Sequence, residues 1–137
     1  MKLVLCFILY SISLSVFAQR TTLTVRVEGI KAEEGIVLLA LYTSQADFLG
    51  EDIFMGKEAS VIHGKATFLF ENVPYGRYAM SSFFDKNENG RLDTNFIGIP
   101  KEPYAFSMNP SSSFGPPSFD EAAFTLDSLS QSITITY

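Results

Sequence analysis

The chain has 137 residues, with 15 acidic and 10 basic side chains and a formal net charge of −5 at pH 7. This mildly acidic balance makes the chain a poor partner for phosphate backbones and excludes nucleic-acid binding. Aromatic residues make up 14% of the chain and charged residues 18%, which excludes a disordered chain and provides for a hydrophobic core.

The first residues are typical of a secretory signal. Lys2 gives a positive start, Leu3–Phe17 is apolar apart from a few hydroxyl-bearing residues, and Val16-Phe17-Ala18 is typical of a signal-peptidase site. The apolar run is shorter than the ~20 residues that a membrane-spanning helix needs. We therefore expect a signal peptide at residues 1–18 and a single domain at residues 19–137. The protein would be exported to the periplasm, the cell surface or the medium, with no membrane span after cleavage.

Cleavage would remove 18 of the 137 residues and leave 119, enough for one domain. It would also remove Lys2, so the formal charge would change from −5 to −6. The only cysteine, Cys6, lies in the signal segment, so the exported domain would have no disulfide. Its stability must come from an aromatic core, aided by any bound metal, and we expect a monomer.

Alternation of apolar and polar residues predicts strands along most of the exported domain. Thr22–Glu28 alternates and ends at Gly29, while the continuously apolar Ile36–Tyr42 is typical of a central strand covered on both faces. Further strands are predicted at Ala66–Glu71, Arg77–Phe84, Ala123–Leu126 and Ser132–Tyr137, with a weak one near Ser60–His63.

The connections complete the predicted fold. Val73–Gly76 is predicted to be a turn, because Pro74 presets φ and glycine can adopt positive φ. The last two strands are expected to form a hairpin around Asp127–Gln131, and Thr94–Glu121 is a long loop rich in proline and aromatic residues. These features predict an all-β fold, an antiparallel β-sandwich of about seven strands that is immunoglobulin-like or transthyretin-like.

The most specific pattern is Asp85–Asp93, where oxygen-bearing side chains occupy positions 1, 3, 5 and 9 and Gly90 occupies position 6. This spacing matches the front of an EF-hand calcium loop, because alternate residues of a tight loop can direct oxygen ligands at one point. The hypothesis is a structural calcium ion. Its ligands would be Asp85, Asn87, Asn89, the backbone carbonyl of Arg91, Asp93 and Glu102.

The surroundings of this pattern depart from an EF-hand. Position 12 is Phe96 in place of glutamate, and Pro100 prevents a regular exit helix. A bidentate carboxylate must then come from elsewhere, with Glu102 the nearest candidate and Asp52 and Asp120 as alternatives. Two acidic ligands in the motif predict a Kd of ~10⁻⁴–10⁻³ M. The simpler alternative is an Asx-rich turn without a metal.

The aromatic residues of the long loop allow two interpretations. Exposed rings would form a platform for a sugar or a peptide, whereas buried rings would close the open end of the sandwich. We favour burial, because a long ordered loop must bury something. The candidate ligand-binding residues are Tyr104, Phe106, Phe114 and Phe119, and Phe96 belongs to the same group.

No catalytic residue is assigned from the sequence. His63 is the only histidine and lacks the companions that a zinc or acid–base site needs. Paired carboxylates could imitate a glycosidase site, but sequence neighbours on a strand face opposite sides, which favours solvated edges. The pairs are Glu33-Glu34, Glu51-Asp52 and Asp120-Glu121.

Three blocks of sequence resemble the DUF2141 family of secreted bacterial proteins: Asp85–Asp93, Gly98–Ser107 and Gly115–Ala122. Ala105 departs from the family pattern, where many members have glycine. The resemblance implies a secreted β-sandwich and implies no particular reaction. The turn at Val73–Tyr78 is also similar to turns in transthyretin-like and carboxypeptidase-regulatory-like sandwiches, which are mostly accessory or adhesive modules.

Together these patterns predict an exported, non-enzymatic β-sandwich with a structural calcium loop. We expect a binding or envelope-associated module whose unknown extracellular ligand is a glycan or a protein. Two alternatives stay open. One is a carbohydrate- or peptide-binding protein that uses the loop aromatics, and the other is a carboxylate-based hydrolase.

Overall fold

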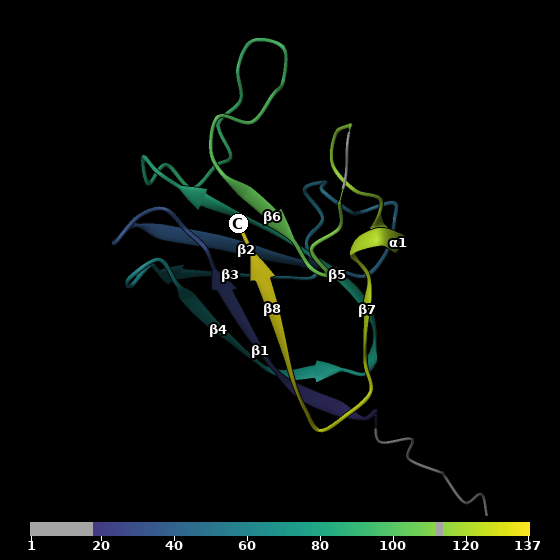
Figure 1. Ribbon diagram of the computed structural model, residues 1–137. Helices are drawn as coiled ribbons and strands as arrows, with labels where there is room; N and C mark the ends of the chain where they lie inside the picture. Colours follow the sequence, from purple (N-terminus) through teal and green to yellow (C-terminus); the bar gives the residue numbers. More distant parts are fainter. Residues whose placement is uncertain (1–17, 112–113) are drawn as a thin grey trace, which may run out of the picture.

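The computed structural model describes residues 18–111 and 114–137, so nearly all of the predicted signal peptide lies outside the described residues. The described residues form two β-sheets and one short helix (Figure 1). The first sheet has the order β4-β1-β8, with β1 at Arg20–Glu28, β4 at Ala66–Pro74 and β8 at Ser130–Thr136. The second has the order β3-β2-β5-β6, with β7 also paired to β5. Its strands are β2 (Ile36–Tyr42), β3 (Met55–Ser60), β5 (Gly76–Asp85), β6 (Tyr104–Phe106) and β7 (Phe124–Leu126).

One buried core joins the two sheets. Because side chains alternate between the faces of a strand, every second residue of each strand can enter this core. In β1 these are Leu23, Val25 and Val27, and in β2 they are Val37, Leu39 and Leu41, all at most 2% exposed. Residues of both sheets belong to this single cluster. The prediction of an all-β domain built from two sheets is therefore confirmed.

The outer face of the second sheet carries a smaller cluster beneath helix α1 (Phe119–Ala122). The ring of Phe48 packs 5.4 Å from Tyr42 and 5.9 Å from Phe119, measured between ring centroids. Ser118 and Glu121 form a capping box that starts the helix. Among the described residues, no helix is long and apolar enough to cross a membrane.

The predicted C-terminal hairpin is wrong. β7 pairs antiparallel with β5 in the second sheet, whereas β8 pairs parallel with β1 in the first sheet. The chain thus passes from one sheet to the other between Leu126 and Ser130. Both strands face the shared core from opposite sides, with Leu126 1% exposed and Ile135 fully buried. Although β7 and β8 are adjacent in sequence, burial against different sheets separates them. The pairing of β8 with β1 also introduces a parallel pair into a sandwich that was predicted to be antiparallel.

Two further differences concern short or exposed strands. The weak strand lies at Met55–Ser60 rather than Ser60–His63, because pairing with β2, for example Ala59 with Val37, defines it. His63 instead occupies a turn with φ 51°. The three-residue β6 lies in the long loop and brings the described total to eight strands rather than about seven.

The parallel strand β8 should be essential for stability. Ile135→Ala removes a fully buried side chain and is expected to lower the free energy of unfolding by about 2–5 kcal/mol. Thr134→Ala, on the exposed face of the same strand, should change it by about 0.5 kcal/mol or less. Urea unfolding followed by circular dichroism measures both. Equal effects would contradict the placement of β8.

Candidate functional site

The loop that follows β5 is built around the buried carboxylate of Asp85, which is 2% exposed. Its Oδ1 accepts a hydrogen bond from the Asn89 backbone N–H at 3.2 Å, and its Oδ2 accepts one from the Gly90 N–H at 2.7 Å. Gly90 has φ 74°, a conformation that glycine adopts without steric cost. The loop therefore folds back over the end of the strand from which it leaves.

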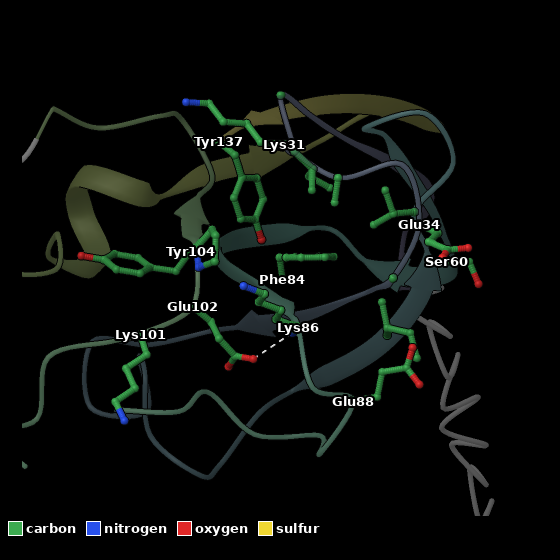
Figure 2. Close-up of a pocket in the computed structure, with 17 residues that line it drawn as sticks. Lys31, Glu34, Ser60, Phe84, Lys86, Glu88, Lys101, Glu102, Tyr104 and Tyr137 are labelled. Carbon is green, nitrogen blue, oxygen red and sulfur yellow. Dashed lines mark hydrogen bonds between the residues drawn. The ribbon is translucent and has the colours of Figure 1, made fainter. Parts of the chain in front are cut away.

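Glu102 joins the two ends of this loop. It is 6% exposed, and its Oε1 accepts the Lys86 N–H at 2.8 Å while its Oε2 accepts the Asp93 N–H at 3.0 Å. The first of these bonds is drawn in Figure 2. The Lys101 N–H donates to the Asp93 carbonyl at 2.8 Å. One carboxylate thus binds the start and the end of the predicted calcium motif.

Three side chains of the motif meet on the outer side of the loop. The Asn87 amide donates to Asp93 Oδ2 at 2.6 Å, and the Asn89 amide lies 3.1 Å from both Asp93 oxygens. Asn89 Oδ1 in turn accepts the Arg91 N–H at 2.9 Å. Positions 3, 5 and 9 of the motif are therefore brought together, whereas Asp85 at position 1 binds backbone N–H groups of the same loop.

These side chains could form a site for a hard cation, because each carries a carboxylate or amide oxygen, although the amide NH₂ groups of Asn87 and Asn89 face Asp93 here. A carboxylate has about four acceptor positions, and Asp85 and Glu102 each use two for backbone N–H groups. A half-turn of the Asn87 amide would direct its oxygen, in place of its NH₂ group, at Asp93. Two such oxygens repel each other unless a cation lies between them.

The other candidate carboxylates do not join this loop. Asp120 accepts a hydrogen bond from Arg77 at 2.7 Å beside helix α1, and Asp52 is an exposed residue of the segment before β3. Within residues 18–111 and 114–137, no three His, Cys, Asp or Glu side chains gather closely enough to hold a metal ion. A calcium ion would therefore need the asparagine amides as well as the carboxylates.

A cleft of about 1210 Å³ opens beside the loop at one end of the two sheets (Figure 2). Ile30, Val61 and Phe84 contribute apolar surface, and Lys86 and Glu102 come from the loop. Sequence analysis did not find this cleft, because its walls come from segments far apart in the chain that share no motif. The base of the calcium motif forms part of the wall.

Tyr137 closes another side of this cleft. Its hydroxyl lies 3.1 Å from Ser82 Oγ, and the Ser82 hydroxyl donates to the Ala105 carbonyl at 3.3 Å. Burial raises the pKa of the Tyr137 phenol well above its ordinary value, although the hydrogen bond with Ser82 acts in the opposite direction. The residue after β8 is thus connected to β5 of the opposite sheet.

The aromatic residues of the long loop divide into two groups. Phe119 is 4% exposed, and Phe106 packs against the same small cluster, so both fill space as the burial interpretation expects. By contrast, Phe96 is 98% exposed, Phe114 is 97% exposed and Tyr104 is 43% exposed. An exposed platform could use only this second group.

The fold and the loop define a class of small all-β domains, in which an oxygen-rich loop follows a central strand of the second sheet. The chain belongs to the family described as an uncharacterized protein conserved in bacteria (DUF2141), whose sequence model matches residues 25–134. The family predicted from the loop motifs is thereby confirmed. No curated protein and no solved structure matches the chain.

The clamp made by Glu102 can be tested with an isosteric change. Glu102→Gln keeps one acceptor oxygen but places an NH₂ group against a backbone donor, so it should lower the free energy of unfolding by about 1–3 kcal/mol. Glu88→Gln, in the exposed part of the same loop, should have little effect. Chemical denaturation compares the two variants. An unchanged midpoint for Glu102→Gln would contradict the clamp.

Stability should also fall in alkaline solution because of Tyr137. Its pKa is higher in the folded protein than the ordinary value of about 10, so its stabilising contribution is complete below about pH 10 and is lost as the pH rises further. Tyr137→Phe should lose less stability between pH 9 and 11 than the unaltered protein, as measured by urea unfolding across that range. A parallel decline in both proteins would contradict this assignment.

Proposed function

We propose that this protein is an exported, non-enzymatic β-sandwich module whose Asp85–Glu102 loop binds a structural calcium ion. The observation that supports the proposal is the meeting of the Asn87 and Asn89 amides on the Asp93 carboxylate. An Asx-rich turn needs local side-chain to backbone bonds, but it does not need three side chains directed at one another. We further propose an immunoglobulin-like or transthyretin-like arrangement of the sandwich and a monomeric state.

The ion would act as a cross-link. In the structure, two neutral amides donate hydrogen bonds to the Asp93 carboxylate and leave its charge uncompensated. A calcium ion would replace these bonds with contacts to the carboxylate and the amide oxygens and would compensate the charge. Because Glu102 ties the same loop to the start of β6, the ion would stabilise the wall of the cleft as well. This combination favours a binding or envelope-associated role with an extracellular ligand, a glycan or a protein.

The first alternative function is binding of a carbohydrate or a peptide by loop aromatics. Half-exposed Tyr104 packs edge-on against Phe106, with 5.6 Å between ring centroids, and Tyr104 also lines the cleft. A flat ring beside polar groups is what a sugar face requires. Among its candidate residues this alternative is therefore restricted to Tyr104 and Phe114, because Phe106 packs against the small cluster and Phe119 is buried.

The second alternative, a carboxylate-based hydrolase, receives less support. Glu121 belongs to the capping box, where hydrogen bonds from the backbone and side chain of Ser118 lower the pKa of its carboxyl group. Asp120 pairs with Arg77. Glu102 uses both oxygens to bind backbone N–H groups. A general acid must be free to donate a proton to a bound substrate. These carboxylates are instead occupied by structural partners.

Calcium should raise the thermal stability of the protein. With a Kd of ~10⁻⁴–10⁻³ M, calcium at 10 mM should add about 1.4–2.7 kcal/mol to the free energy of unfolding relative to the protein in chelator. Differential scanning calorimetry measures the shift, with magnesium at the same concentration as the control for ionic strength. A midpoint that calcium does not move would refute the metal site.

A charge variant distinguishes a cation site from a polar turn. Asn87→Asp places a second carboxylate against Asp93, so it should lower the unfolding midpoint in chelator and enlarge the increase that calcium produces. Asn95→Asp is the matched control, because it adds the same charge to the loop and keeps the oxygen that accepts two backbone hydrogen bonds. If calcium rescues neither variant, the loop is a turn and the proposal fails.

A further inference from the structure

Beyond the proposed metal motif, the loop extends into a short finger at Thr94–Pro100. An isolated β-bridge joins these two residues at its base. In Figure 1 the segment is the green loop that stands away from both sheets beyond the ends of β5 and β6. Its tip exposes Phe96 by 98%, Ile97 by 65% and Ile99 by 54%, and it contains no charged residue. Three large apolar side chains at a projecting tip are an uncommon surface for a protein in water.

Hydrogen bonds within the finger, from its backbone N–H groups to Asn95 and Ile99, define its conformation. Asn95 Oδ1 accepts the N–H groups of Ile97 at 3.0 Å and Ile99 at 2.9 Å. The Asn95 N–H donates to the Ile99 carbonyl at 2.8 Å, and the Gly98 N–H donates to the Asn95 carbonyl at 3.0 Å. Four of the five N–H groups from Asn95 to Ile99 are therefore bonded within the finger. The Phe96 N–H is the exception, and the exposed surface of the tip is formed largely by apolar side chains.

A bilayer surface matches both properties. Backbone that enters an apolar phase must satisfy its hydrogen bonds internally, because no water is available there. Side chains such as Phe and Ile gain free energy when they leave water for the acyl boundary. A narrow convex tip can enter lipid, which deforms around it, whereas a protein partner would need a preformed pocket of matching shape.

Two cationic side chains lie at the base of the finger, beside the Asp93 carboxylate. Lys101 directly follows Pro100, and its backbone N–H bonds to Asp93, two residues from Arg91 on the other arm of the loop. Both cations are exposed, and neither has an ion-pair partner among the described residues. Cations beside an apolar tip complement the phosphates of anionic lipids.

We propose that the Thr94–Pro100 finger inserts Phe96, Ile97 and Ile99 into the surface of a membrane that contains anionic phospholipid. The exported domain would thereby be held at the envelope without a membrane span. Lys101 and Arg91 would contact lipid phosphates at the base of the finger. The proposal is independent of the metal site, although an ion bound at Asp93 would make the base of the finger more positive.

Vesicle flotation tests this proposal with phosphatidylcholine vesicles that either contain or lack phosphatidylglycerol. The protein without its signal segment should float with the anionic vesicles. Phe96→Ser together with Ile97→Ser should reduce the partition coefficient by at least about tenfold, because two exposed apolar side chains are lost. Their exposure means that folding should be unaffected, which circular dichroism and urea unfolding verify.

Two controls make the result specific. Phe114→Ser removes an equally exposed ring outside the finger and should leave flotation unchanged. Arg91→Gln with Lys101→Gln should weaken binding to the anionic vesicles and leave any binding to neutral vesicles as it was. The proposal is overturned if the unaltered protein floats with neither vesicle, if the double serine variant floats as well as it does, or if Phe114→Ser is equally defective.

Repeating the flotation in calcium and in chelator separates the two proposals. Vesicle binding by a protein whose unfolding midpoint ignores calcium would retain the lipid-binding finger and reject the metal site. A calcium-stabilised protein that binds no vesicle would do the reverse. If the finger binds a protein partner and no lipid, the protein will bind no vesicle, and the lipid proposal is rejected.

Discussion

Of the two buried carboxylates that hold the Asp85–Pro100 region, that of Glu102 joins its two ends. Its two oxygens bind backbone N–H groups at both ends of the loop, at Lys86 and Asp93. Because the side chain is 6% exposed, these bonds replace the water that a charged group would otherwise require. The oxygen-rich loop, the wall of the cleft and the base of the apolar finger all start from this clamp. Any function of the region needs it in place.

Two sheets position that clamp. Glu102 lies two residues before β6, which pairs with β5 in the second sheet, and β5 ends at Asp85, where the loop begins. On the first sheet, β8 runs parallel to β1 and ends near Tyr137, whose hydroxyl lies beside Ser82 of β5. The cleft beside the clamp is therefore lined by residues at the ends of β1, β5 and β8, which belong to both sheets. A rigid scaffold of this kind can present a loop in one defined conformation.

Much of this arrangement could be predicted from local pattern. A continuously apolar run predicted Ile36–Tyr42 with the bounds that the structure has, and the spacing of Asp85–Asp93 predicted the convergence of Asn87, Asn89 and Asp93. The four-residue helix α1 was missed, although the capping box of Ser118 and Glu121 could have indicated it. Edge strand β3 was displaced, because its residues are mostly exposed and its bounds depend on pairing with β2.

By itself, the sequence determined the all-β class, the family and the order of oxygen-bearing side chains along the loop, because these depend on residue spacing within a few positions. Only the tertiary structure decided which sheet each C-terminal strand joins, since both β7 and β8 are apolar on one face and long-range burial selects their partners. It also decided that Phe119 is buried while Phe96 is exposed. The two rings occur in the same proline-rich segment, and only the packing of distant strands distinguishes them.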